Sequence, residues 1–258
     1  MSLNAQPNKA HYALSELARR KPKFLTLSQN VDGLSPRAGH PEDQLKLLHG
    51  NLFNVKCEDE DGCGYFRRND FTDPITPALA IPEEEEEETS STAQSRFPPN
   101  QTFRDMIASK AALIKGLDIS NAETPLSTIP RDSLPHCPQC KTSLLRPGVV
   151  WFGESLPQSA LSDIDAYFNE SDTNQSQTKP IDLCLVIGTS SKVYPAAGYA
   201  SVARAQGARV AIVNMDRSDA RDLQEGDWFF EGDAAEIVPE ILRSVIGEVR
   251  LPEDGKVV

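Results

Sequence analysis

Apolar residues follow two patterns along the chain, and each pattern predicts one kind of element. Spacings of three or four positions predict helices over residues 7–20, 159–168, 195–206 and 233–245. Short apolar runs predict strands at 24–27, 183–187 and 209–213. A run that is apolar almost throughout, such as 183–187, is typical of a strand buried on both faces of a parallel sheet.

The order of these elements indicates the fold class. Strand 183–187, helix 195–206 and strand 209–213 form a βαβ unit, whose crossover is right-handed in nearly all proteins. We therefore predict an α/β protein with a Rossmann-like parallel sheet and helices on both faces. Residues 146–148 are predicted as a turn before a short strand at 149–152, and residues 1–55 and 144–258 are assigned to this domain.

Polar or glycine-rich residues follow three of the predicted strands. They are Gln29, Asn30 and Asp32; Gly188, Thr189 and Ser190; and Asn214 with Asp216. The carboxyl ends of parallel strands lie on one edge of a sheet, where ligands collect, so three such clusters indicate a nucleotide-sized site. His49 follows nearby in the sequence. The alternative is that Asp32 caps a helix, Asn30 makes an Asx turn and His49 is an ordinary surface histidine.

Residues 56–143 differ in composition and are predicted to form a small separate module. Cys57 and Cys63 precede a polar stretch, and Cys137 and Cys140 follow it as a CxxC pair. Four thiolates satisfy the tetrahedral preference of Zn²⁺ and leave no open position, so we predict one structural zinc ion. Unligated thiols, or redox chemistry at the CxxC pair, are the alternatives. Within this module, the acidic segment near 82–100 is predicted to be disordered.

Charge and cysteine content narrow the function class. The net charge is −12, and six of those charges belong to the glutamate run 83–88, so no basic face for nucleic acid is indicated. No apolar run is long enough to span a membrane, and the first residues lack the apolar core of a secretory signal. Five cysteines do not make a closed disulfide framework, which favours an intracellular, reducing compartment, whether mitochondrial, cytoplasmic or nuclear.

With these features in place, the chain resembles the sirtuins, which are NAD-dependent protein lysine deacylases. The resemblance rests on motifs that recur in the family's order: Gln29-Asn30-Val31-Asp32, His49-Gly50, the four cysteines, Leu145-Arg146-Pro147, Val150 to Glu154, Gly188-Thr189-Ser190, Val193 to Ala197, and Asn214. The sequences of residues 150–154 and 193–197 are most similar to class III sirtuins, the branch that includes desuccinylases and demalonylases.

The resemblance implies roles for these residues. His49 would be the catalytic base, with Asn30 and Asp32 orienting the nicotinamide and its ribose. NAD would also contact the residues Gln29, Gly188, Thr189, Ser190, Asn214, Asp216, Asp233 and Ala234. The acyl-lysine peptide would pair as an added strand with Val150, Trp151, Phe152, Gly153 and Glu154. The products would be nicotinamide and O-acyl-ADP-ribose, and the protein is expected to be a monomer.

One departure from the family pattern leads to a second hypothesis. Sirtuins carry a Gly-Ala-Gly-x-Ser turn that receives the pyrophosphate, and this motif does not occur in the sequence. We expect the first strand–helix unit, together with the residues that select the acyl group, to be absent. The second hypothesis is therefore a truncated or degenerate sirtuin that binds peptides without turnover. A simple NAD-linked dehydrogenase is disfavoured by the lack of GxGxxG.

Overall fold

The computed structural model describes residues 3–59, 61–80, 128–169, 181–220 and 223–252. They divide into two compact units. The first comprises described residues of Met1–Lys56, Phe66–Asp70 and Arg146–Val258, and the second those of Cys57–Tyr65 and Phe71–Leu145. The predicted disordered segment near 82–100 lies outside the described residues.

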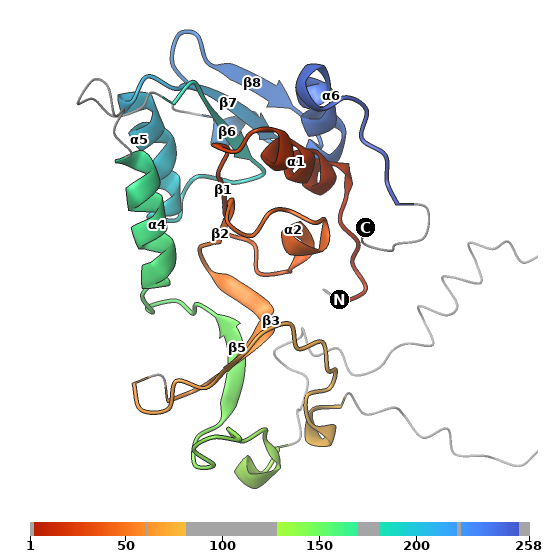
Figure 1. Ribbon diagram of the computed structural model, residues 1–258, viewed down its shortest axis with the longest axis vertical. Coiled ribbons are helices and arrows are strands. Elements are labelled where there is room, and N and C mark those ends of the chain that lie inside the picture. Colours follow the sequence, from red (N-terminus) through yellow and green to blue (C-terminus); the bar gives the residue numbers. More distant parts are fainter. Residues whose placement is uncertain (1–2, 60, 81–127, 170–180, 221–222, 253–258) are drawn as a thin grey trace, which may run out of the picture. The chain divides into compact units, whose positions relative to one another are not determined.

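The elements of the described residues are shown in Figure 1. The α-helices are α1 (Lys9–Arg20), α2 (Leu34–Arg37), α4 (Gln158–Phe168), α5 (Tyr199–Ala205) and α6 (Ala234–Ile246). The strands are β1 (Thr26–Ser28), β2 (Leu45–Leu47), β3 (Gly50–Cys57), β4 (Phe66–Arg67), β5 (Leu145–Val149), β6 (Leu183–Ile187), β7 (Arg209–Asn214) and β8 (Trp228–Glu231). Short 3₁₀ turns lie at Pro77–Leu79, Arg131–Ser133, Ala196–Gly198 and Arg217–Asp219.

Parallel strands carry the candidate site, which confirms the predicted α/β class. β1 pairs with β2 in parallel, from Thr26 opposite Leu45 to Ser28 opposite Leu47. β6, β7 and β8 form a second parallel sheet in that order, so their carboxyl ends share one edge. Among the described residues, no backbone ladder joins β1 to β6, so the parallel strands form two sheets where the sequence suggested one. The third sheet has the order β4-β3-β5.

Side chains alternate across β7 because successive residues of a strand point to opposite faces. Val213 packs with α1 and α6 in one core cluster, whereas Val210 and Ile212 pack with Ala220 in another. Figure 1 shows α1 beside α6, consistent with this shared core. Burying a valine completely contributes about 1.5 to 3 kcal/mol, so the two faces of β7 anchor the sheet whose edge bears the site.

β6 is less buried than its apolar sequence predicted. Leu183 is 44% exposed and the other four residues are partly buried, whereas four of the six residues of β7 are buried. The prediction of burial on both faces is therefore wrong for β6. The reason is its position, because β6 is the outermost strand of the described three-stranded sheet.

The strand predicted at 149–152 is displaced. β5 covers Leu145–Val149 and includes the residues predicted as a turn, whereas the observed turn lies at 152–153. Proline usually interrupts strands because it has no N–H, but an edge strand tolerates it. Pro147 is tolerated for that reason, since β5 is the outer strand of its sheet. Gly148 allows close packing, because a Cβ there would lie 2.7 Å from Asn54 Cβ.

Other boundaries differ more modestly. The helix predicted at 195–206 begins as a 3₁₀ turn and becomes α-helical at Tyr199. β8 was not predicted, because four residues between polar segments give little periodic signal. None of the described helices combines the length and the apolar character that crossing a membrane would require.

Candidate functional site

His49 lies at the junction between β2 and β3, one residue before Gly50. Parallel pairing places the carboxyl ends of β1 and β2 side by side, so Gln29, just after β1, is close to His49. The Nδ1 of His49 lies 2.9 Å from the carbonyl oxygen of Gln29. A carbonyl oxygen can only accept a hydrogen bond, so Nδ1 carries the proton in this contact. In the neutral imidazole, Nε2 is then the free base.

Gly50 is required by the close approach of β3 and β5. Its φ is +77°, and a Cβ at this position would lie 2.0 Å from the carbonyl oxygen of Gly148. On the same side, the N–H of Val150 donates to the carbonyl oxygen of His49 at 2.9 Å. The backbone of His49 is therefore bound directly to the segment after β5.

Hydrogen bonds connect the strand ends that the sequence grouped together. Gln29 Nε2 donates to the hydroxyl of Thr189 at 3.3 Å, and Asn214 Nδ2 donates to the carbonyl of Thr189 at 3.0 Å. In the same region, the N–H of Gly188 donates to the carbonyl oxygen of Val213, and the N–H of Gly232 donates to the carbonyl oxygen of Asn214. The structure thus brings Gln29, Thr189 and Asn214 together.

Asp32 and Asn30 both lie in the turn after β1. The carboxylate of Asp32 accepts from the N–H of Leu34, the first residue of α2, at 3.0 Å, whereas the N-cap residue of α2 is Gly33. Asn30 is exposed, and its own N–H donates to the Ser28 hydroxyl at 3.2 Å. A carboxylate that accepts one hydrogen bond keeps a second oxygen that can accept others, so this contact is compatible with a ligand role.

The remaining predicted cofactor residues lie at the ends of β6, β7 and β8. Ser190 is exposed, Asp216 accepts from the N–H of Ser218 at 2.7 Å, and Asp233 caps α6 by accepting from Ala235 at 2.8 Å. Ala234 begins α6. Asp219 was not predicted from the sequence, and its carboxylate accepts from Asn214 Nδ2 at 3.3 Å. It belongs to no motif, so only the structure could find it.

The predicted peptide-binding segment, residues 150–154, forms a turn after β5. Its Trp151 and Phe152 are exposed, and Gly153 adopts a φ of +91°. Glu154 N–H donates to the Trp151 carbonyl at 3.0 Å and closes the turn. Phe152 is therefore a fully exposed apolar side chain, two residues after Val150, whose N–H binds the backbone of His49.

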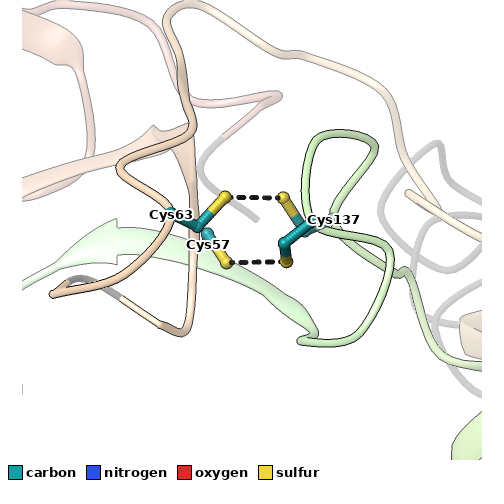
Figure 2. A group of neighbouring side chains, drawn as sticks. Cys57, Cys63 and Cys137 are labelled. Atoms are coloured by element: carbon teal, nitrogen blue, oxygen red, sulfur yellow. Dashed lines mark hydrogen bonds between the residues drawn. The ribbon is translucent and has the colours of Figure 1, made fainter.

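The four predicted metal ligands converge within the second unit. Their sulfur atoms all lie within 4.8 Å of one another. Cys57 Sγ lies 3.8 Å from Cys140 Sγ, and Cys63 Sγ lies 3.5 Å from Cys137 Sγ. Figure 2 shows the sulfurs of Cys57, Cys63 and Cys137 pointing toward one another. Four thiolates bound tetrahedrally at about 2.3 Å from Zn²⁺ would be about 3.8 Å apart, so the sulfur arrangement fits zinc.

The cysteine environments differ within the cluster. Burial raises the pKa of Cys57 to about 12, whereas hydrogen bonds to the backbone of Ser143 and to Thr142 lower the pKa of Cys140 to about 5. All four cysteines are free thiols without disulfides. His136 is engaged elsewhere, since its Nδ1 donates to the Leu134 carbonyl at 2.8 Å. The cluster is therefore a four-cysteine set.

Comparison with known proteins gives one family. The family model described as "Sir2 family" matches residues 1–195. An NAD-dependent protein deacylase of Candida albicans is 43% identical over 254 residues, covering 96% of this chain and 76% of that protein. The mitochondrial NAD-dependent protein deacylase sirtuin-5 of the dog is 31% identical over 245 residues, covering 93% of this chain and 62% of that protein.

Solved structures agree with the sequence relatives. A Sir2 homologue in complex with NAD is 27% identical and superposes with a TM-score of 0.57, covering 94% of this chain and 66% of that one. A Sir2 structure with acetylated peptide has the same TM-score at 23% identity, which supports the shared fold.

Proposed function

The chain belongs to the Sir2 family, and from that premise we propose that it is an NAD-dependent protein lysine deacylase. The relatives that support this are named NAD-dependent protein deacylases. The observation that carries the proposal is the orientation of His49. Its imidazole is fixed by Gln29 on one side, and its backbone is bound to Val150 on the other.

The residues at the strand ends fit a dinucleotide. Gln29, Thr189 and Asn214 present amide and hydroxyl groups where the strand ends of the two parallel sheets meet, and Gly188 and Gly232 allow close backbone approach there. Asn30 and Asp32 stand next to Gln29 and would orient the nicotinamide and ribose, while Ser190, Asp216, Asp233 and Ala234 would line the remainder. NAD, when bound, supplies a ribose carbon that can accept the acyl oxygen and release nicotinamide.

His49 would act on a proton. With Nδ1 donating to Gln29, Nε2 can accept a proton from a ribose hydroxyl, and the resulting imidazolium keeps its Nδ1 contact. Gln29 then holds the ring in one tautomer throughout, so no rearrangement is needed during the transfer.

The peptide would bind beside the segment 150–154. In this proposal, the exposed Phe152 contacts the residues flanking the acyl-lysine, while Val150 remains bound to His49. This would place the modified lysine near the imidazole, and the acetylated peptide named for one solved Sir2 structure supports a peptide substrate of this kind. Zinc, held by Cys57, Cys63, Cys137 and Cys140, would have no open coordination position and would stabilise the second unit.

The test is a direct assay of products. The purified chain is incubated with NAD and an acyl-lysine peptide, and mass spectrometry measures deacylated peptide, nicotinamide and O-acyl-ADP-ribose. We expect equimolar formation of all three, dependent on NAD. Peptide binding by calorimetry without any product would instead favour the peptide-binding hypothesis, and hydride transfer to NAD would favour a dehydrogenase.

A further inference from the structure

The side chain of Arg146 lies beneath the segment 150–154 and contacts it at several points. Arg146 is 9% exposed. Its Nη1 lies 2.5 Å from Glu154 Oε1 and its Nη2 lies 2.9 Å from Glu154 Oε2, a bidentate pair. The same Nη2 donates to the Val149 carbonyl at 2.9 Å. The guanidinium therefore joins the end of β5 to the end of the turn that follows it.

The carboxylate of Glu154 is engaged from several directions. Besides Arg146, it accepts from the N–H of Trp151 at 2.9 Å. These hydrogen bonds and the ion pair hold the pKa of Glu154 near 2, well below its usual range. A carboxylate with these three contacts is committed to the turn itself, which makes it a poor candidate for binding a peptide directly.

The aromatic residue of the turn is also fixed by Arg146. The guanidinium carbon lies 3.6 Å from the centroid of the Trp151 ring, which is a cation–π contact. One face of the indole is therefore covered, while the residue remains about half exposed. The next residue, Phe152, is held outward at the tip of the turn.

These contacts lead to the backbone of His49. Val150 follows the Arg146-bound Val149, and its N–H donates to the His49 carbonyl. A buried guanidinium that loses its carboxylate is strongly destabilising locally, because its charge stays away from water. Loss of the pair would therefore release the turn while leaving the His49 imidazole bound to Gln29.

From this arrangement we infer that Arg146 and Glu154 are positioning residues that hold Trp151 and Phe152 in place to receive the peptide. Glu154 acts through the turn and is not itself a peptide contact. This inference rests on the proposed deacylase function, and it concerns the peptide side of the site alone. It predicts that breaking the pair weakens peptide binding, with little effect on NAD or on the chemical step.

The test compares two near-isosteric variants. The ion pair of Arg146 with Glu154 is called the clamp below. Glu154→Gln removes the negative charge from the clamp, and Asp227→Asn removes the negative charge from the ion pair between Arg204 and Asp227. Asp227 is a suitable control because it precedes β8 and bonds to the N–H of Val210, at the opposite end of the sheet from Asn214. Arg146→Lys is a second clamp variant, which keeps the charge and removes the bidentate fork.

Two readouts are measured for each variant. The first is steady-state kinetics with peptide and NAD varied separately. The second is acrylamide quenching of Trp151, made specific by the substitution Trp228→Phe in all proteins, since the chain has two tryptophans. We expect Glu154→Gln to raise the peptide KM about tenfold, which is the effect of losing one charged hydrogen bond. The kcat and the NAD KM should stay nearly unchanged. Acrylamide should quench the fluorescence of Trp151 more strongly than in the parent.

The outcomes separate the inference from the function it rests on. A peptide KM that changes no more in Glu154→Gln than in Asp227→Asn, or a loss confined to kcat, overturns the positioning role. If the parent binds acyl-lysine peptide without turnover, calorimetry replaces KM, and a weaker Kd in Glu154→Gln supports the clamp although the deacylase proposal fails. A parent that binds no acyl-lysine peptide overturns both.

Discussion

His49 Nδ1 donates a hydrogen bond to the backbone carbonyl of Gln29, 2.9 Å away. The partner is a main-chain atom, so substitution of the Gln29 side chain would not remove the contact. The parallel register of β1 and β2 sets this distance, because it places Ser28, one residue before Gln29, opposite Leu47, two residues before His49. A short pair of strands thus selects the tautomer of the proposed catalytic base.

Replacing this imidazole should abolish turnover and preserve binding. For His49→Ala we expect kcat to fall by about 10² to 10⁴, the usual contribution of general-base catalysis. The peptide Kd should stay nearly constant, because Val150 bonds to the backbone of His49. His136→Gln is the matched control, since His136 also donates from Nδ1 to a carbonyl. Equal losses in the two variants would contradict a catalytic role.

The cysteine cluster gives a prediction about metal content. Metal analysis of the reduced protein should find one zinc per chain, and Cys137→Ser should lower that value and reduce thermal stability, because metal binding is coupled to folding. Cys184→Ser is the control, since Cys184 lies in β6, outside the cluster. A reduced, folded protein without zinc would disprove the metal assignment and favour unligated thiols.

These two sites show which features could be predicted from the sequence. Residue types and spacing were enough to predict that the four cysteines form one cluster. Gln29, Thr189 and Asn214 were predicted to lie close together because the carboxyl ends of parallel strands share an edge. Two kinds of fact were inaccessible. The Arg146–Glu154 pair depends on a turn at 152–153, where the sequence predicted the end of a strand over 149–152, and the exposure of β6 depends on which strand is outermost. Both are consequences of strand pairing, which local periodicity does not specify.

The depressed pKa of Glu154 predicts a pH dependence. Its folded-state pKa of about 2 lies below that of the unfolded chain, near 4.5. The ionised pair therefore stabilises the fold fully above the unfolded pKa, and this contribution is lost as the pH falls from about 4.5 toward 2. Urea unfolding of the parent and of Glu154→Gln should differ most at neutral pH and converge on acidification. A difference independent of pH would exclude the carboxylate as its source.

The similarity of 150–154 and 193–197 to class III sirtuins predicts the acyl group. For a protein that joins this chain to the expected first strand–helix unit, and with peptides of one sequence, we expect kcat/KM to be about tenfold or more higher for succinyl-lysine or malonyl-lysine than for acetyl-lysine. Unmodified lysine peptide serves as the blank. A chain that prefers acetyl-lysine would show that these two motifs do not report acyl selection.

Gly50 offers a test of how tightly the site is built. Alanine at this position must adopt a φ of +77° and place its Cβ 2.0 Å from the carbonyl oxygen of Gly148. Gly207 is the matched control, because its φ is +98° and no atom lies within 4 Å of the added Cβ. Gly207→Ala should therefore lose only the left-handed strain, roughly 1 to 2 kcal/mol.

Gly50→Ala should lose clearly more stability, because β3 and β5 must also separate at Gly148. That separation would stretch the neighbouring contact between Val150 N–H and the His49 carbonyl, so peptide binding should weaken along with stability. Thermal unfolding and peptide calorimetry on both variants provide the measurement. If the two alanine variants lose equal stability, β3 can shift without strain, and the close approach of Gly50 to Gly148 does not constrain the position of His49.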